Sequence, residues 1–103
     1  MRFIPIRTDE EFKVVAGTER SQAAIMVLNA GQTTGGTDNR HEYSDQWLYV
    51  ISGYGRAVVE GVEFELKKGS FLLIEKGEAH EITAGPERIV TINFYAPPEY
   101  PVD

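Results

Sequence analysis

The chain has 103 residues with 10 basic and 16 acidic side chains, so its formal net charge is −6, and this length fits a single domain over residues 1–103. The absence of cysteine excludes disulfides, thiolate metal sites and a cysteine nucleophile. The scattered basic residues, the lack of any apolar run near the roughly 20 residues of a membrane span, and a start unlike a signal peptide together predict a cytoplasmic protein that binds neither nucleic acid nor a membrane.

Glycines at short, even intervals divide the chain into segments of strand length, which is typical of β-sandwiches and barrels. Near the start, residues 8–11 could cap at most one helical turn before a β-prone stretch. The predicted strands cover residues 22–28, 46–51, 71–74, 78–83 and 88–95. Residues 56–66 form the clearest hairpin, because apolar residues alternate with glutamates around a tight turn at Glu60 and Gly61. Prolines exclude a helix or a central strand from residues 96–101, so we expect an all-β fold.

The strand predicted at residues 46–51 is apolar on both faces. Leu48 and Val50 lie on one face, and Trp47 and Tyr49 lie on the other. Neither face suits bulk water, so we expect both to be covered. The N-terminal strands of the chain or a second copy of the protein could cover the second face, and the sequence leaves these alternatives open.

The two histidines lie on or beside predicted strands. His80 shares a face with Ile82 and Ala84, and His41 shares one with Asn39, so strand alternation predicts that both imidazoles point inward. Two inward imidazoles on different strands could hold a first-row metal. Each could instead be a hydrogen-bonded core histidine or a half-buried surface one, and alternation alone does not decide between these roles.

Two spaced motifs surround the histidines. The first, at about residues 35–55, reads Asn39-Arg40-His41, four residues, Gln46, six residues, Gly53. The second, at about residues 69–84, reads Gly69, five residues, Glu75-Lys76-Gly77, two residues, His80. In order and spacing these resemble the two motifs of the cupin family, and the short hairpin between them has the length expected of that family.

The resemblance places His41 and His80 on metal-ligating histidines of the family. Gln46 stands where cupins usually have a glutamate, and Asn39 stands where they usually have the first histidine. A side-chain amide brings no charge to a metal. We therefore expect these four residues to bind a divalent iron, manganese, nickel, copper or zinc ion more weakly than the usual cupin ligands, which include the glutamate, would bind it. Asn39 and Gln46 could also orient the imidazoles or line a pocket without a metal.

Other residues are candidates for the pocket lining. Glu42 and Tyr43 lie in the loop within the first motif, where Glu42 could supply the missing carboxylate or act as a general base, or the loop could simply be solvated. Asn93, with Thr91 and Tyr95 on the same face of its strand, could line the pocket or face solvent, since alternation does not decide between these directions. Leu48 and Ile82, which face inward, complete the expected lining.

The resemblance also implies a fold and a range of functions. The fold is a cupin-type double-stranded β-helix, an RmlC-like jelly roll of two antiparallel sheets, commonly assembled as a homodimer. The implied function is that of a small metalloenzyme, of the dioxygenase or isomerase type, acting on a small oxyanionic or phenolic molecule. The missing glutamate favours the alternative, a non-catalytic metabolite-binding or sensing module with a weak or lost metal site. A third possibility is a protein that acts only through its dimer surface, and the fold does not choose among the three.

Overall fold

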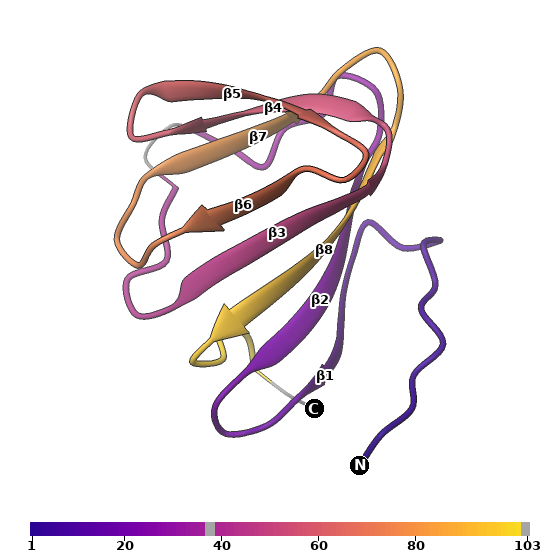
Figure 1. Cartoon of the computed structure of the whole chain (residues 1–103), viewed down its shortest axis with the longest axis vertical. Helices are drawn as coiled ribbons and strands as arrows, with labels where there is room; N and C mark the ends of the chain where they lie inside the picture. The colour runs from indigo at the N-terminus through magenta and orange to yellow at the C-terminus, as the bar shows by residue number, and fades with distance from the viewer. Residues whose placement is uncertain (37–38, 102–103) are drawn as a thin grey trace.

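The computed structural model describes residues 1–36 and 39–101 as an all-β molecule (Figure 1). Its strands are β1 (Phe12–Gly17), β2 (Gln22–Leu28), β3 (Asp45–Ser52), β4 (Tyr54–Val59), β5 (Val62–Lys67), β6 (Phe71–Ile74), β7 (His80–Ala84) and β8 (Ile89–Ala96). Residues 8–11 do not form the helical turn allowed for them, because the chain bends there and enters β1, which pairs with β2. No helix able to span a membrane occurs in the described ranges.

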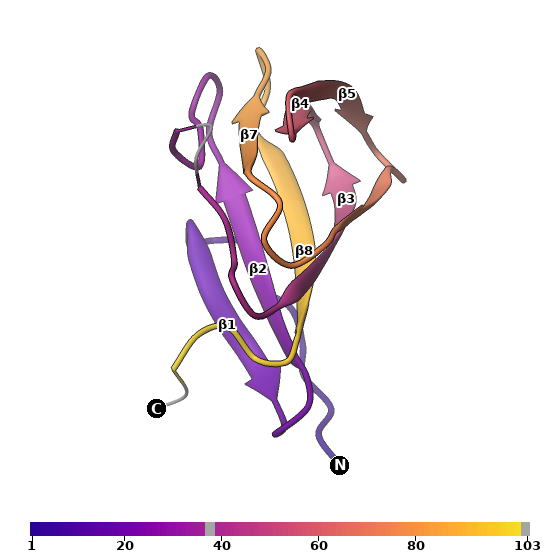
Figure 2. The ribbon, with the colours of Figure 1, turned by 90° about the vertical axis from the view of Figure 1, so that its left-hand side faces the viewer.

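The strands form two antiparallel sheets, which Figures 1 and 2 show from two sides. The order is β1-β2-β8-β3-β6 in the larger sheet and β5-β4-β7 in the smaller one. The chain passes from the larger to the smaller sheet between β3 and β4, at Gly53. This glycine has a φ of 92°, and a Cβ there would lie 2.0 Å from the carbonyl oxygen of Arg88, so no side chain fits. The predicted jelly roll of two antiparallel sheets is confirmed.

Several strands have the bounds that the sequence predicts. β2 and β6 cover the predicted residues, and β3 extends its prediction by one residue at each end. The predicted hairpin joins β4 to β5 through Glu60 and Gly61, whose φ angles are 47° and 79°. Two successive residues with positive φ match the right-handed twist of the paired strands, which explains why this short turn closes the hairpin.

The core lies between the two sheets. Its buried apolar side chains come from seven of the strands and are Met26, Leu28, Leu48, Val50, Ala57, Val59, Leu66, Ile74, Ile82, Ala84 and Ile89. The side chains that point inward are not apolar from one end of each strand to the other. On β3 the inward series runs from Gln46 to Leu48 and Val50, and on β8 it runs from Tyr95 back to Ile89. One end of the barrel is therefore dry, and the other is polar.

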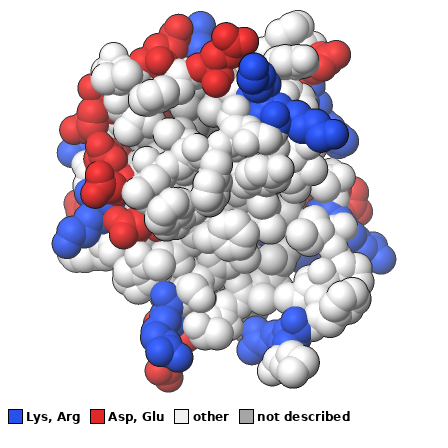
Figure 3. Space-filling model, viewed as in Figure 1, with Lys and Arg blue, Asp and Glu red and all other residues white. Residues whose placement is uncertain are grey.

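The outer face of β3, β6 and β8 is apolar and exposed. Trp47 and Tyr49 remain 39% and 40% exposed, Phe71 is 61% exposed, and Phe94 is 40% exposed. Figure 3 shows a broad uncharged area over these strands. The first strand does not cover them, because β1 pairs edge to edge with β2 at the far side of the sheet. The sequence left open whether the N-terminal strands or a second copy of the protein cover Trp47 and Tyr49. The N-terminal strands do not cover them.

Candidate functional site

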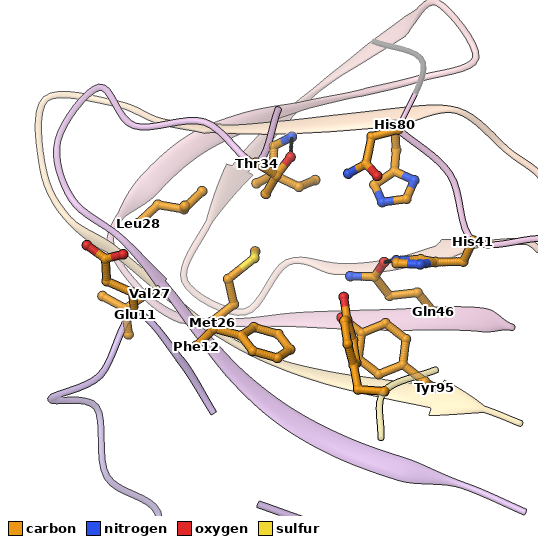
Figure 4. Close-up of a pocket in the computed structure, with 13 residues that line it drawn as sticks. Glu11, Phe12, Met26, Val27, Leu28, Thr34, His41, Gln46, His80 and Tyr95 are labelled. Atoms are coloured by element: carbon orange, nitrogen blue, oxygen red, sulfur yellow. Dashed lines mark hydrogen bonds between the residues drawn. The ribbon is translucent and has the colours of Figure 1, made fainter. Parts of the chain in front are cut away.

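A cavity of about 270 Å³ opens at the polar end of the barrel (Figure 4). Its lining consists of Glu11, Phe12, Met26, Val27, Leu28, Thr34, Asn39, His41, Gln46, His80, Ile82, Tyr95 and Tyr100. Both histidines and both amide residues of the two motifs are in this lining. Strands and loops that are distant in sequence thus bring the four candidate ligands to one cavity.

His80 begins β7 and points into the cavity (Figure 4). It is 3% exposed and Ile82 is 1% exposed, which confirms the inward face predicted by alternation. Its Nδ1 lies 3.1 Å from the carbonyl oxygen of Glu78, and since a carbonyl only accepts, Nδ1–H is the donor and Nε2 keeps its lone pair. Burial lowers the pKa of His80, which favours the neutral imidazole that a metal requires.

His41 lies beside β3, in the loop that precedes this strand. Alternation therefore does not explain its direction, and backbone contacts between the two motifs do. The carbonyl oxygen of His41 accepts a hydrogen bond of 2.7 Å from the backbone N–H of Gly77, and that of Asn39 accepts one of 2.8 Å from His80. These bonds hold the loop beside β7, so that the two imidazole rings lie 5.1 Å apart between centroids.

Gln46 is held by a directed chain of buried hydrogen bonds. The Thr91 hydroxyl donates to the carbonyl oxygen of Met26 at 3.0 Å, and Asn93 Nδ2 donates to Thr91 Oγ1 at 2.9 Å. Gln46 Nε2 then donates to Asn93 Oδ1 at 2.8 Å. Because a backbone carbonyl can only accept, the whole chain has one direction. Gln46 must present its oxygen, and not its NH₂ group, to His41.

Two tyrosines form a wall of the cavity beside His41. The Tyr95 ring meets His41 edge-on at 5.3 Å between centroids, and Tyr100 lies 5.2 Å from Tyr95. Burial raises the pKa of both phenols, so both stay protonated and can donate hydrogen bonds. From the sequence, Tyr95 could line the pocket or face solvent, and Tyr100 was not predicted to be near the site. Tyr100 belongs to the irregular tail, where no periodicity assigns a direction, and only its aromatic character among prolines was a signal.

The other candidates lie in different surroundings. Glu42 is exposed and Tyr43 is 77% exposed, and neither is part of the cavity lining. Leu48 is fully buried in the core, and Asn93 is fully buried behind Gln46. The carboxylate that reaches a motif histidine is instead that of Glu99, whose Oε2 lies 3.3 Å from Nδ1 of His41.

The donor atoms at this end fit a metal ion without an acidic ligand. Nε2 of His41 and Oε1 of Gln46 are 3.0 Å apart, a spacing suited to two neighbouring ligands that each bind one ion at about 2.1 Å. His80 offers a further neutral nitrogen. In the described ranges, no three His, Cys, Asp or Glu side chains form a metal-binding group, so any ion here relies on amide oxygen. Without an ion, His41 Nε2–H donates to Gln46, so a metal and a proton compete for this nitrogen.

Comparisons with known proteins agree with this fold. A family model described as a cupin domain matches residues 24–94. The structure of KdgF from Halomonas sp. is 26% identical with a TM-score of 0.77, over 84% of this chain and 77% of that chain. A Bacillus halodurans protein is 22% identical with a TM-score of 0.85, over 92% and 76%. A predicted oxalate decarboxylase from Thermotoga maritima is 20% identical with a TM-score of 0.76, over 84% and 79%. No curated protein matches the chain.

Proposed function

Because the chain belongs to the cupin family, we propose that it binds a divalent transition metal through His41, Gln46 and His80, with Asn39 beside them. One observation carries the proposal. The buried hydrogen-bond chain aims the oxygen of Gln46 at the cavity, 3.0 Å from Nε2 of His41. Metal-ligating histidines commonly donate their second ring N–H to a backbone carbonyl or carboxylate, and the Nδ1 atoms of His80 and His41 face such groups.

The neutral ligand set bears on which molecules the site accepts. Two imidazoles and one or two amides leave a divalent ion with its full charge, so the ion would polarise an anionic oxygen as a Lewis acid. Tyr95 donates its phenol hydrogen to Tyr100, so the phenol of Tyr100 can donate its own hydrogen bond to the same oxygen. Apolar side chains, including Met26 and Ile82, also line the cavity. We propose a small oxyanionic or phenolic substrate and a reaction of the dioxygenase or isomerase type.

The comparisons suggest where to begin a substrate search. The similar protein from Thermotoga maritima is described as a predicted oxalate decarboxylase. A small carboxylate is compatible with a cavity of about 270 Å³ that has hydrogen-bond donors on one wall. Small carboxylates are therefore the first compounds to test, followed by diketones and catechols.

A second function, metabolite binding without catalysis, is supported by a different observation. In the described ranges, no buried side-chain nitrogen or oxygen lacks a hydrogen-bond partner. The polar end is thus internally satisfied with His41 donating to Gln46 and no ion present. Such a pocket could sense a small metabolite while holding a metal weakly or not at all.

Thermal unfolding with added ligands distinguishes these two functions. A ligand present at about a hundred times its dissociation constant stabilises the folded state by about 2.7 kcal/mol. The metal proposal predicts that at least one of iron(II), manganese(II), nickel(II), copper(II) or zinc(II) raises the melting temperature, and that His80→Ala removes this rise. Stabilisation by small carboxylates with none by any metal would overturn it in favour of metabolite binding.

For the partner, we propose a second copy of the chain, docked on the outer face of β3, β6 and β8. Trp47, Tyr49, Phe71, Leu73 and Phe94 are all exposed on this face, and Trp47 and Phe71 pack at 5.4 Å between ring centroids. A chain of charge −6 repels its own copies, and this uncharged face minimises the repulsion while burying apolar surface. A two-fold dimer uses the same patch on both copies.

Sedimentation velocity tests the dimer. The parent is expected to sediment as a dimer and Phe71→Lys as a monomer. The matched control is Phe64→Lys, since Phe64 is 42% exposed on β5 of the other sheet, and it should leave the dimer intact. A monomeric parent, or a Phe71→Lys variant that remains dimeric, would rule out this interface.

A further inference from the structure

The segment that follows β8 folds back across the polar end of the barrel. Figure 2 faces this end and shows the segment crossing in front of β2 and β1. We call residues 97–101 the tail. Gln22 binds its backbone three times: Nε2 donates to the carbonyl oxygen of Tyr100 at 2.8 Å, and Oε1 accepts from the N–H groups of Glu99 and Tyr100 at 3.2 and 3.0 Å. The Ser44 hydroxyl donates to the carbonyl oxygen of Pro97 at 2.7 Å.

The Gln22 and Ser44 side chains that bind the tail are both buried. Gln22 is 2% exposed and Ser44 is 1% exposed. A buried polar side chain destabilises the fold unless its hydrogen bonds are made, and these two make theirs with the tail. Removing the tail would leave them unsatisfied. The tail is therefore a fixed wall of the site.

The fixed tail places two side chains against the site. Tyr100 packs on Phe12 at 4.8 Å and on Tyr95 at 5.2 Å between ring centroids, which closes one side of the cavity. The neighbouring Glu99 directs its carboxylate at His41, with Oε2 3.3 Å from Nδ1. The side chains of His41 and Glu99 are only 11% and 26% exposed, so water screens this pair less than a surface pair.

We propose that Glu99 is a positioning residue that holds His41 with Nδ1–H toward the tail and Nε2 toward the cavity. The part of this inference that concerns metal affinity rests on the proposed function. Gln46 brings no charge, and Glu99 supplies a negative charge from behind His41 instead. A carboxylate that accepts the second N–H of a ligating histidine fixes the tautomer and increases the basicity of the ligand. The carboxylate of this site thus comes from outside both sequence motifs.

Three variants separate the contributions of Glu99. Glu99→Gln keeps an acceptor and removes the charge, Glu99→Ala removes both, and Gln22→Ala leaves the charge in place and releases the tail. Glu87→Ala, an exposed glutamate in the turn before β8, is the matched control. The partly exposed Glu99 can be replaced without opening the core, and circular dichroism verifies the fold.

The first readout needs no metal. Nitrogen-15 shifts of the His41 ring report which of its two nitrogens carries the proton. Without a metal, Glu99 at Nδ1 and the oxygen of Gln46 at Nε2 compete for the ring proton. We therefore expect a larger fraction of the Nδ1–H tautomer in the parent and in Glu87→Ala than in Glu99→Ala, where Gln46 alone favours Nε2–H. Identical His41 shifts in Glu99→Ala and the parent would overturn the inference.

The second readout is metal affinity by calorimetry, with zinc(II) as the probe. We expect Glu99→Ala to weaken binding 10- to 100-fold, with smaller losses for Glu99→Gln and Gln22→Ala and none for Glu87→Ala. Binding by the parent that Glu99→Ala leaves unchanged would overturn the role in metal affinity. A parent that binds no metal would overturn the proposed function instead, and the nitrogen-15 shifts alone would then decide the inference.

Discussion

The two ends of the barrel are built from the same strands but differ in chemistry. On β3 the inward side chains run from Gln46 at one end to Val50 at the other, and on β8 they run from Tyr95 to Ile89. Alternation places a side chain inside, and its chemical type then decides what it does there. The dry end contributes stability through buried apolar area. The polar end buries amides and imidazole, which cost stability unless paired, so their presence indicates a function.

The largest expected effect concerns the dry end. Leu48→Ala removes a fully buried side chain and leaves a cavity, so we expect unfolding in urea to show a loss of about 2–5 kcal/mol. Metal affinity should stay close to that of the parent. Val62→Ala, at a position 55% exposed on β5, should lose much less. Equal losses for the two variants would contradict the assignment of the dry end to stability.

An intermediate effect is expected in the chain of buried hydrogen bonds that holds Gln46. Asn93→Ala leaves Gln46 Nε2 without its buried acceptor, which should lower the free energy of unfolding by about 1–3 kcal/mol. The freed amide no longer has a fixed direction, so metal affinity should fall as well. Both quantities should be unaffected in Asn29→Ala, an exposed position. A loss of stability with unchanged metal affinity would show that this chain of hydrogen bonds supports the fold but not the site.

Gln46→Glu should raise metal affinity and lower the stability of the metal-free protein. The carboxylate adds a charge to the ligand set, so calorimetry should show about tenfold tighter metal binding. It cannot donate to Asn93 Oδ1, so the metal-free variant should be less stable than the parent. Gln32→Glu, in an exposed loop, serves as the control. Weaker metal binding by Gln46→Glu would argue against residue 46 as a ligand.

The smallest expected effect is a pH dependence of stability. Burial lowers the pKa of His80 in the folded state, while the unfolded chain has the ordinary value of about 6.5. The unfolded state therefore binds more protons near that pH, so this contribution to stability is complete above about pH 6.5 and is lost as the pH falls. Urea midpoints measured at decreasing pH should fall less steeply in His80→Gln. Parallel midpoints in the parent and the variant would contradict this assignment.

Sequence patterns predicted the parts of the molecule in which apolar residues or glycines recur at regular intervals. The strands, the tight turn at Glu60 and the inward direction of His80 all follow from alternation and glycine placement. The contacts of His41, Tyr100 and Glu99 were not predictable in this way, because all three lie in irregular segments whose direction is set by tertiary hydrogen bonds. The Gln22 side chain illustrates the difficulty, since its partners lie 77 and 78 residues away.

Metal binding at the polar end is tested most directly by calorimetric titration of the chelator-treated protein with each divalent transition metal. The double variant His41→Ala/His80→Ala is titrated in parallel. The proposed site predicts close to one ion bound per chain in the parent and none in the double variant. No binding by the parent to any of these ions, or equal binding by the double variant, would contradict it.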